Sequence, residues 1–424
     1  MTIFLLENHE LPIIEATALI KVGSIYDPPD RGGLASLTGT VMRTGGVLGI
    51  TSDEFDIQLD KRGARIQIDV DAERTTATLW SLAENFDYTF RLFALMLMNP
   101  AFANDKLSLA KVNACQDLRR LPDNPQQLAL REFKKIFYQG NPRGNVPTID
   151  SIQRITRNDL VAFHHMFFKP CHIYLGISGD FSAQAMKLII QNNFSSWTAD
   201  CPPLPASALP KQPHQTVLYT LRRSLPQSTI IAGHCAPSKT DPDYYAFQVL
   251  DYLIGSGGFS SRMMAQIRTV QGLAYSVGSF YQTTPTFGMF GMYCITKSAT
   301  TYQAFESMHA ITQDMRLTPP SASEVQQAKE AIINNFIFSS ASPRQILMQH
   351  MLIEFDHLPS DFFSSFPDRI RSLKVEDIVR AACTWLTPEA MTVFILGELE
   401  AFGAVPTSLA SLPHHTISSD LVSE

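Results

Sequence analysis

Long hydrophobic runs are missing from this sequence. No stretch approaches the roughly 18 consecutive apolar residues that a membrane-spanning helix needs. The N-terminal segment Met1–Glu7 has neither a basic region nor a long apolar core, so it does not resemble a secretion signal. We therefore expect no membrane span. We expect a cytoplasmic chain, or a periplasmic one if a leader was removed.

Net charge and cysteine spacing exclude further classes of protein. The formal net charge of -6 argues against nucleic acid or an anionic membrane surface as the main partner. The six cysteines are scattered along the chain and include no C-x-x-C pair. This spacing fits neither a zinc ribbon nor a disulfide-rich scaffold, so we expect buried free thiols.

Motifs for autonomous hydrolysis and for phosphate binding are also absent. The sequence contains no H-E-x-x-H, no H-x-x-E-H and no G-x-S-x-G. The glycines near position 255 are not followed by G-K-[ST], so they do not form a phosphate-binding loop. His164 and His165 are adjacent and cannot share one face of a helix. We therefore expect no metal site built within this chain.

The sequence does contain one pattern of elements that occurs twice. A β-rich run, a Pro-containing turn, two helices, two strands and two further helices follow one another in both halves of the chain. Pro28 and Pro242 are 214 positions apart, and Gly63 and Gly272 are 209 positions apart. We predict an α+β fold with two homologous halves, each an antiparallel-rich sheet covered by helices. The predicted halves are 1–200 and 216–424, joined by a Pro-rich linker at 201–215.

Turn and capping residues set the predicted boundaries of these elements. In the first half we expect strands at 13–22, 64–71, 75–82 and 173–179, and helices at 33–42, from a cap at Ser52 to about Gly63, at 85–97 and at 105–121. In the second half we expect strands at 227–235, 273–281, 289–295 and 391–397, and helices at 244–254, 259–270, 300–315 and 321–338. Ser321 and Glu324 form a predicted capping box.

A glycine-rich stretch opens the most informative part of the second half. Glycine suits both a tight turn between helices and close approach of a ligand, and the sequence favours neither use. Ser260 or Ser261 can cap the helix that follows. The residues of this loop are Gly255, Gly257, Gly258 and Phe259.

Arg268 and Tyr275 follow this loop, on either side of Gly272. Arg268 falls in the last turn of a predicted helix, and Gly272 suits the left-handed residue that ends it. Tyr275 falls on a predicted strand, on the same face as Leu273, Val277, Ser279 and Tyr281. The two side chains can therefore meet on one surface. On spacing alone, such an arginine and such a tyrosine are ordinary structural residues.

Several segments resemble the insulinase/pitrilysin-type zinc peptidases, and within them the mitochondrial processing peptidases and their bacterial relatives. The segment GSGGFSSRMMAQIRTVQGLAYSVGSF, from Gly255, is similar to the family's glycine-rich loop, arginine and GLAYS pattern. The segment VGSIYDPPDRGGLASLTGTVMRTGG, from Val22, resembles the part that carries the family's inverted zinc motif. The resemblance extends over nearly the whole chain and implies a duplicated metallopeptidase-like domain.

The zinc motif itself is degenerate in this chain. The family's H-x-x-E-H would fall on residues 36–40, where Ser36 and Thr40 replace the histidines and Gly39 replaces the general-base glutamate. The family's third ligand would fall near Gln116 or Asp117. Because imidazoles and carboxylates hold zinc, the resemblance implies that this chain holds no metal and does not hydrolyse peptides alone.

Arg268 and Tyr275, by contrast, match the family's pair that binds the substrate carbonyl and the oxyanion. The resemblance therefore implies a non-catalytic subunit of a heterodimeric zinc metallopeptidase. A zinc-bearing homologous partner would supply zinc and base, and an extended peptide would add a strand to a sheet edge. The glycine-rich loop, from Gly255 to Phe259, would contact that peptide. Two alternatives stay open: a structural scaffold with no role in hydrolysis, and a homodimer that binds peptides without cleaving them.

Overall fold

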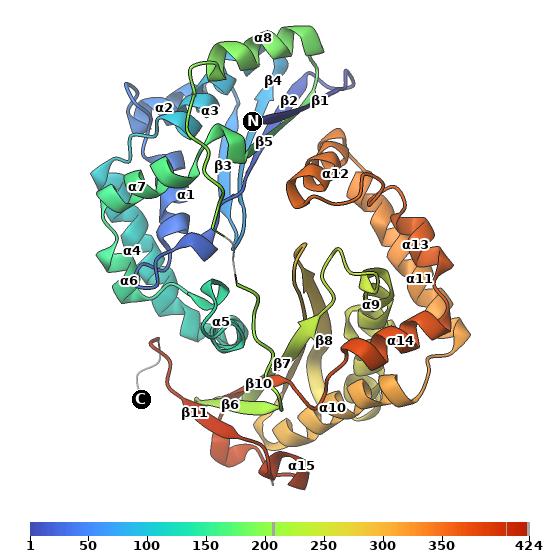
Figure 1. Cartoon of the computed structure of the whole chain (residues 1–424). Helices are drawn as coiled ribbons and strands as arrows, with labels where there is room; N and C mark the ends of the chain where they lie inside the picture. The colour runs from blue at the N-terminus through green and yellow to red at the C-terminus, as the bar shows by residue number, and fades with distance from the viewer. Residues whose placement is uncertain (206–207, 404, 422–424) are drawn as a thin grey trace. The chain divides into compact units, whose positions relative to one another are not determined.

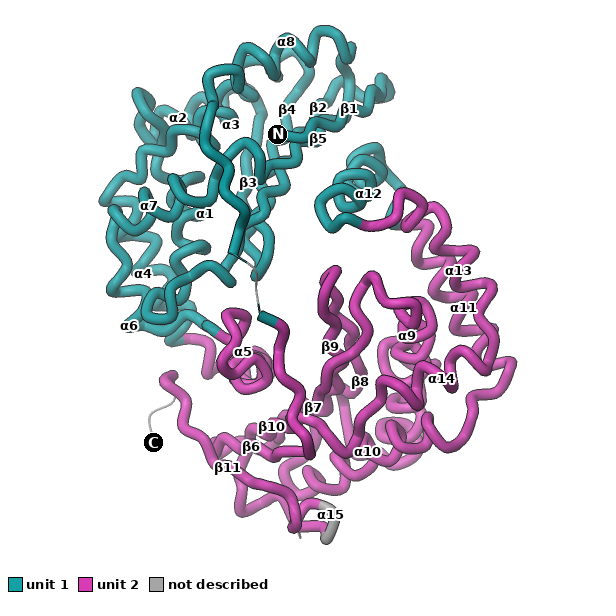
Figure 2. The backbone as a smooth tube through the Cα atoms, viewed as in Figure 1, with its two compact units in different colours: residues 1–119, 145–208, 339–357 teal, residues 120–144, 209–338, 358–424 magenta. Residues whose placement is uncertain are grey.

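Two compact units make up the chain. The computed structural model describes residues 1–205, 208–403 and 405–421, so residues 206 and 207 of the predicted linker lie outside the described residues. Unit 1 comprises residues 1–119, 145–208 and 339–357, and unit 2 comprises 120–144, 209–338 and 358–424 (Figure 2). Each unit combines helices with one mixed sheet, which confirms the α+β class.

Unit 1 is built on a five-stranded sheet in the order β1-β5-β2-β4-β3. β1 runs parallel to β5, and every other neighbouring pair is antiparallel. β2 is central, which explains why its second half is buried without alternation. The strands are β1 (Thr2–Glu7), β2 (Ile13–Ile20), β3 (Arg65–Val70), β4 (Thr75–Leu82) and β5 (Ile173–Gly179).

Helices pack on the unit 1 sheet and on one another around an apolar core (Figure 1). They are α1 (Leu34–Thr44), α2 (Ser52–Asp60), α3 (Phe86–Met98), α4 (Asn104–Arg120), α6 (Ile149–Arg154), α7 (Arg157–Phe167), α8 (Ala183–Phe194) and α12 (Pro343–Asp356). The predicted cap of α2 is wrong by one residue. Thr51 is the N-cap and forms the capping box with Glu54, whereas the Ser52 hydroxyl donates a hydrogen bond of 2.6 Å to the Thr44 carbonyl.

The N-terminus of α1 is capped from a distance. Its N-cap residue is Gly33, which has no side chain and a left-handed φ of 98°. The carboxylate of Asp27, in the preceding turn, instead accepts hydrogen bonds of 2.8 Å from the backbone N–H groups of Gly33 and Ala35. Asp27 is buried, and this burial raises the pKa of its carboxyl to about 7 although the backbone donors favour the charged form.

Unit 2 is built on a six-stranded sheet in the order β11-β6-β10-β7-β9-β8. β6 runs parallel to both β10 and β11, and the remaining neighbours are antiparallel. The strands are β6 (Val217–Arg222), β7 (Gln227–Ala236), β8 (Ala274–Thr283), β9 (Gly288–Lys297), β10 (Thr392–Gly397) and β11 (His414–Ile417).

The helices of unit 2 include two π-helical segments. The α-helices are α5 (Pro125–Phe137), α9 (Tyr244–Asp251), α10 (Thr301–Leu317), α11 (Ala322–Ile337), α13 (Phe366–Ser372), α14 (Val375–Trp385) and α15 (Thr407–Ala410). The π-helical segments are η6 (Tyr252–Ser256) and η8 (Met264–Val270). Ser321 and Glu324 form the predicted capping box at the start of α11, so that prediction is confirmed.

The two sheets share one topology, which confirms the predicted duplication. Strands β6, β10, β7, β9 and β8 repeat the order and the relative directions of β1, β5, β2, β4 and β3, and unit 2 adds β11 at one edge. Gly63 and Gly272 both have left-handed φ values, 60° and 63°, and each lies directly before the edge hairpin of its sheet.

The duplicated halves exchange one helix each. α5 belongs to the first half of the sequence but packs on β7 and β10 of unit 2. α12 belongs to the second half but packs on β1, β2 and β5 of unit 1. Gly176 on β5 allows this, because a Cβ there would lie 2.2 Å from the Met351 sulfur. Sequence patterns did not predict the exchange.

One expectation about the cysteines is wrong. Cys171 and Cys201 form a disulfide, although they are 30 residues apart and their spacing matches no framework. Cys115 and Cys294 are buried free thiols as expected, Cys235 is half-buried and Cys383 is exposed.

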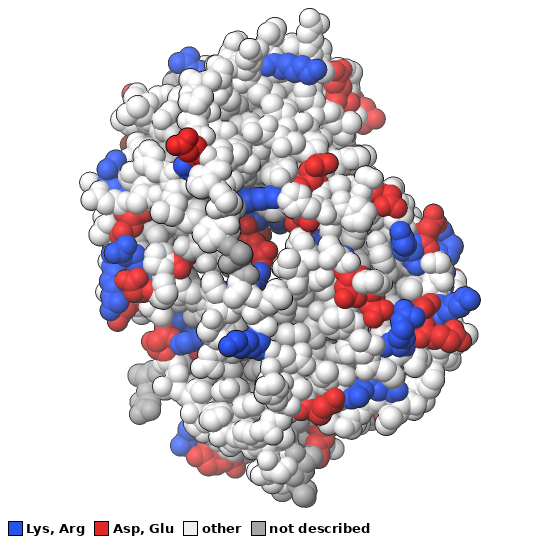
Figure 3. Space-filling model, viewed as in Figure 1, with Lys and Arg blue, Asp and Glu red and all other residues white. Residues whose placement is uncertain are grey.

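Charges of both signs share the surface. On the face drawn in Figure 3, Lys and Arg are interspersed with Asp and Glu. Among the described residues, no helix combines the length and the apolar composition that crossing a bilayer requires.

Candidate functional site

The glycine-rich loop forms where helix α9 approaches strand β8. α9 continues directly into the π-helical turn η6, which ends at Gly257. A Cβ on Gly255 would lie 2.3 Å from the Ser279 backbone nitrogen, and one on Gly257 would lie 2.6 Å from the Tyr252 carbonyl oxygen. Gly258 has a left-handed φ of 59° with open space around it. Close packing thus accounts for the first two glycines, and backbone conformation for the third.

Ser261 starts the helix that carries Arg268. Its buried hydroxyl donates to the Gly258 carbonyl at 2.7 Å and accepts from the Met264 N–H at 3.4 Å, so Ser261 rather than Ser260 is the cap. The helix becomes the π-helical segment η8, which contains Arg268, and ends before Gly272. π-Helical turns are rare and are frequent at functional sites.

A β-bulge sets the direction of Tyr275. The register of β8 against β9 shifts between Ala274 and Ser276, so Tyr275 is an extra residue in the edge strand. Its side chain is 78% exposed, whereas Val277 and Ser279 are buried. The prediction that these three residues share one face of a regular strand is therefore wrong, because the bulge interrupts the alternation.

Arg268 lies close to two exposed aromatic rings. Its guanidinium carbon is 5.3 Å from the ring centroid of Tyr275 and 5.3 Å from that of Phe259. The structure therefore brings Arg268 and Tyr275 together, and it adds Phe259 from the glycine-rich loop. Within residues 1–205, 208–403 and 405–421, the Arg268 side chain makes no hydrogen bond or ion pair. Its donors are open to a ligand.

These residues open onto a pocket of about 270 Å³. The pocket is lined by hydroxyl groups, small residues and the Arg268–Tyr275 pair: Gly255, Ser256, Gly258, Met264, Arg268, Tyr275, Ser276, Val277, Ser279 and Tyr293. The lining contains no carboxylate and no imidazole, so it is suited to hydrogen bonding and charge stabilisation rather than to proton abstraction.

Asp251 supports the pocket from behind. Its carboxyl, at the end of α9, is 5% exposed and accepts a hydrogen bond of 2.5 Å from the Ser279 hydroxyl on β8. Burial raises the pKa of Asp251 to about 6, although hydrogen bonds from Ser279 and Ser256 favour the ionised form. Sequence reasoning missed this pair. An aspartate at the end of an apolar helical run was the one available indication.

The degenerate motif lies on α1 in unit 1. Ser36 and Thr40 are exposed, and the Thr40 hydroxyl donates back to the Ser36 carbonyl at 2.9 Å. Gly39 is buried, and a Cβ there would lie 2.7 Å from a methyl of Val70 on β3. The volume that a glutamate would occupy is therefore already filled.

The residues at the positions expected for metal ligands are the second feature of this region. Gln116 and Asp117, on α4, are both exposed. Among the described residues, no group of three or more His, Cys, Asp or Glu side chains is placed to hold a metal ion. The hydroxyls and the glycine of the degenerate motif do not fit zinc.

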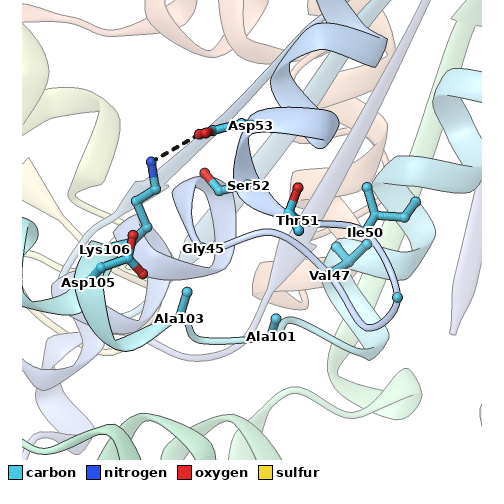
Figure 4. Close-up of a pocket in the computed structure, with 11 residues that line it drawn as sticks. Gly45, Val47, Ile50, Thr51, Ser52, Asp53, Ala101, Ala103, Asp105 and Lys106 are labelled. Carbon is cyan, nitrogen blue, oxygen red and sulfur yellow. Dashed lines mark hydrogen bonds and ion pairs between the residues drawn. The ribbon is translucent and has the colours of Figure 1, made fainter.

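A second, larger pocket lies in unit 1, next to the C-terminal end of α1. It measures about 640 Å³ and is bounded by the turn after α1 and by the first turns of α2 and α4 (Figure 4). Lys106 reaches across part of it to Asp53, at 3.5 Å. Glycine, alanine and short polar residues make up most of the wall, and they present no catalytic grouping.

The fold and the degenerate motif together define a duplicated α+β protein of the metallopeptidase type. Family comparison agrees: the model described as Insulinase (Peptidase family M16) matches residues 3–148, and the one described as Peptidase M16 inactive domain matches residues 154–332. The chain belongs to peptidase family M16, and the resemblance inferred from the sequence is confirmed.

Individual relatives have mixed descriptions. An uncharacterized zinc protease of Rickettsia bellii is 26% identical over 306 residues, which are 68% of this chain and 70% of that protein. The non-peptidase homolog YmxG of Helicobacter pylori is 26% identical over 289 residues, which are 64% of this chain and 62% of that protein. A crystal structure of a peptidase M16 inactive domain from Pseudomonas fluorescens has a TM-score of 0.85 at 23% identity, covers 93% of this chain and 95% of that chain, and establishes the shared fold.

Family membership and the residues of the degenerate motif lead to one conclusion. This chain is a member of family M16 in which Ser36, Gly39 and Thr40 stand where the resemblance places the zinc motif, and these residues do not fit zinc.

Proposed function

We propose that this chain is the substrate-binding and transition-state-stabilising subunit of a heterodimeric zinc metallopeptidase. One observation carries the proposal: Arg268 and Tyr275 lie together at a pocket with their donors open, while the metal motif of the same chain is degenerate. A chain that keeps donors but has lost metal ligands fits a shared active site. A zinc-bearing homologous subunit would supply the metal and the general base.

The proposed contribution of this chain is electrostatic. The Tyr275 hydroxyl donates to the oxyanion that forms at the scissile carbonyl, and the Arg268 guanidinium donates to a neighbouring carbonyl of the peptide. Donors of this kind are effective because they are oriented before the charge develops. The rings of Phe259 and Tyr275 both lie within cation–π distance of the guanidinium and help to hold it in place.

An edge strand supports the binding of an extended peptide. Among the strands of the described residues, β8 pairs with β9 alone, so one side of its backbone faces no other described strand. A peptide can add to such an edge through main-chain hydrogen bonds, which tolerate many sequences. The bulge at Tyr275 directs that side chain away from the ladder.

The disulfide supports an oxidising compartment. Disulfides persist in the periplasm and outside cells and are rare in the cytosol. Cys171–Cys201 therefore favours the periplasmic alternative for this chain.

The test is a reconstitution. Hydrolysis of an unstructured reporter peptide is measured for this chain, for its zinc-bearing homologue and for the mixture. We expect only the mixture to cleave. Arg268→Ala or Tyr275→Phe should slow it by about 10²-fold or more, because losing one oxyanion donor costs that much. Arg371→Met is the matched control, since Arg371 is an exposed arginine that pairs with Asp368 on its own helix. A homologue that cleaves equally fast alone would make this chain a scaffold.

A further inference from the structure

The pocket beside Arg268 has an uncompensated positive charge. Arg268 forms no ion pair with any described residue, and the lining of the pocket contains no acidic side chain. Several other arginines of unit 2 are paired: Arg262 with Glu324, Arg316 with Glu389, and Arg380 with Asp243 and Asp377. Arg268 differs from these arginines because it lines a pocket and has no ion-pair partner among the described residues.

The groups around Arg268 are donors of matching chemistry. Hydroxyls of Ser276, Tyr275 and Tyr293 belong to residues that line the same pocket, whereas the Ser256 hydroxyl is hydrogen-bonded to Asp251. Asp251 does not line the pocket. Its buried carboxyl accepts a hydrogen bond from the hydroxyl of Ser279, which does line it. A guanidinium in a pocket lined with hydroxyl groups is suited to bind a carboxylate.

Size and the neighbouring rings restrict the ligand further. A volume of about 270 Å³ accommodates one short side chain or a chain terminus, because pockets for drug-sized ligands begin at about 300 Å³. The rings of Phe259 and Tyr275 both lie within cation–π distance of the guanidinium, at 5.3 Å from its carbon, and such contacts do not consume its N–H donors.

We propose that this pocket binds a carboxylate of the peptide, so that the chain prefers peptides that present a negative charge to Arg268. The inference rests on the proposed function only in taking a peptide as the ligand. Two sources share this chemistry: the C-terminal carboxylate and the side chain of an aspartate or glutamate. Both pair with a guanidinium through charge-assisted, bidentate hydrogen bonds, which a neutral amide cannot form.

The experiment measures binding to the purified full chain by fluorescence anisotropy, without a partner. The probes are one short Ala/Gly/Ser peptide, labelled at its blocked N-terminus, in four forms: C-terminal amide, free C-terminal acid, amide with one internal glutamate, and amide with glutamine in its place. We expect at least one carboxylate form to bind about tenfold tighter than its neutral match, because its hydrogen bonds are charge-assisted. Which form gains affinity identifies the source.

Variants make the test specific. Arg268→Met should remove the difference between acid and neutral forms, and Arg268→Lys should retain only part of it, since an ammonium lacks the planar fork. Arg371→Met should leave the difference unchanged. Equal affinity for all four peptides, no binding of any, or an unchanged preference in Arg268→Met would each overturn the inference. None of these outcomes decides the reconstitution above, which measures hydrolysis of a peptide by the mixture.

Discussion

The Ser279 hydroxyl donates a hydrogen bond of 2.5 Å to the buried carboxyl of Asp251. This bond joins the end of α9 to strand β8, four residues beyond Tyr275. Gly255 makes the contact possible, because any Cβ there would collide with the Ser279 backbone. The glycine-rich loop and the strand that carries Tyr275 are therefore fixed to each other by a buried polar pair.

Removing one partner of this pair should cost stability. Ser279→Ala removes the short hydrogen bond to the Asp251 carboxyl and leaves Ser256 as its other side-chain donor, and losing a hydrogen bond to a buried carboxyl costs about 1–3 kcal/mol. We expect the free energy of unfolding in urea to fall by that amount. Ser276→Ala, on the same strand and half-buried, is the control and should change the free energy of unfolding by less than about 0.5 kcal/mol. An equal loss in both variants would contradict the role assigned to the pair.

The raised pKa of Asp251 predicts how the free energy of unfolding changes with pH. Burial raises the pKa to about 6 in the folded state, above the ordinary value of 3.8 for an aspartate. Between these two values the folded chain binds a proton that the unfolded chain has released. The contribution of Asp251 to the free energy of unfolding therefore decreases as pH rises from about 4 to about 6, and is constant above.

Asp251→Asn isolates this contribution. The pKa of Asp27 is also raised, to about 7, so its contribution to the free energy of unfolding changes with pH in the same direction. Comparing wild type with Asp251→Asn cancels the contribution of Asp27. We expect the difference in free energy of unfolding between wild type and Asp251→Asn to change across this pH window, in favour of the wild type at the acidic end. Urea unfolding of both proteins at several pH values measures it. A difference that is independent of pH would show that Asp251 titrates normally.

Local sequence patterns predict much of the fold and the contact between Arg268 and Tyr275. Alternation and glycine punctuation placed β4 and β5, and the duplicated order of strands followed from the repeated pattern. The contact of Arg268 with Tyr275 followed from a helix end and a strand start on either side of Gly272. Short-range geometry of this kind depends on a few neighbouring residues, and the sequence displays those directly.

Features that depend on distant residues could not be predicted. Amphipathic periodicity shows that α5 and α12 bury one face, but not that each packs on the sheet of the other half. The bulge at Tyr275 depends on register against β9, and the Cys171–Cys201 bond depends on the path of the chain between them. β1, β6 and β11 were missed, because short parallel strands at or near a sheet edge have no hairpin partner in the sequence.

Restoring the glutamate of the zinc motif should destabilise unit 1. In Gly39→Glu, the new Cβ would lie 2.7 Å from a methyl of Val70 and 3.1 Å from one of Ile68. Overpacking of this kind typically costs about 1–3 kcal/mol. Ser36→His, at an exposed position of the same helix, should be nearly neutral. Thermal unfolding of both variants tests this, and a Gly39→Glu protein as stable as wild type would show that β3 yields to the helix.

Two substitutions of Tyr275 should distinguish the role of its ring in peptide binding from the role of its hydroxyl in hydrolysis. Tyr275→Phe keeps the ring that contacts Arg268 but removes the oxyanion donor, so it should preserve the preference for a carboxylate peptide and lose hydrolysis in the reconstituted complex. Tyr275→Ala removes both and should lose both. Peptide binding and hydrolysis are measured on the same preparations. If Tyr275→Phe cleaves at the wild-type rate, the hydroxyl has no part in the reaction.

The disulfide should account for a measurable share of the stability of unit 1. Cys171 and Cys201 enclose a 30-residue segment that contains β5 and α8, and closing a loop of this length stabilises a fold by about 3–4 kcal/mol in the chain-entropy model. We expect the double variant Cys171→Ser/Cys201→Ser to unfold at lower urea concentration by that free energy, and the wild type in reducing buffer to behave in the same way. Cys383→Ser removes an exposed free thiol and serves as the control. If the wild type unfolds at the same urea concentration with and without reductant, the bond does not constrain the unfolded chain. The argument for an oxidising compartment would then lose its support.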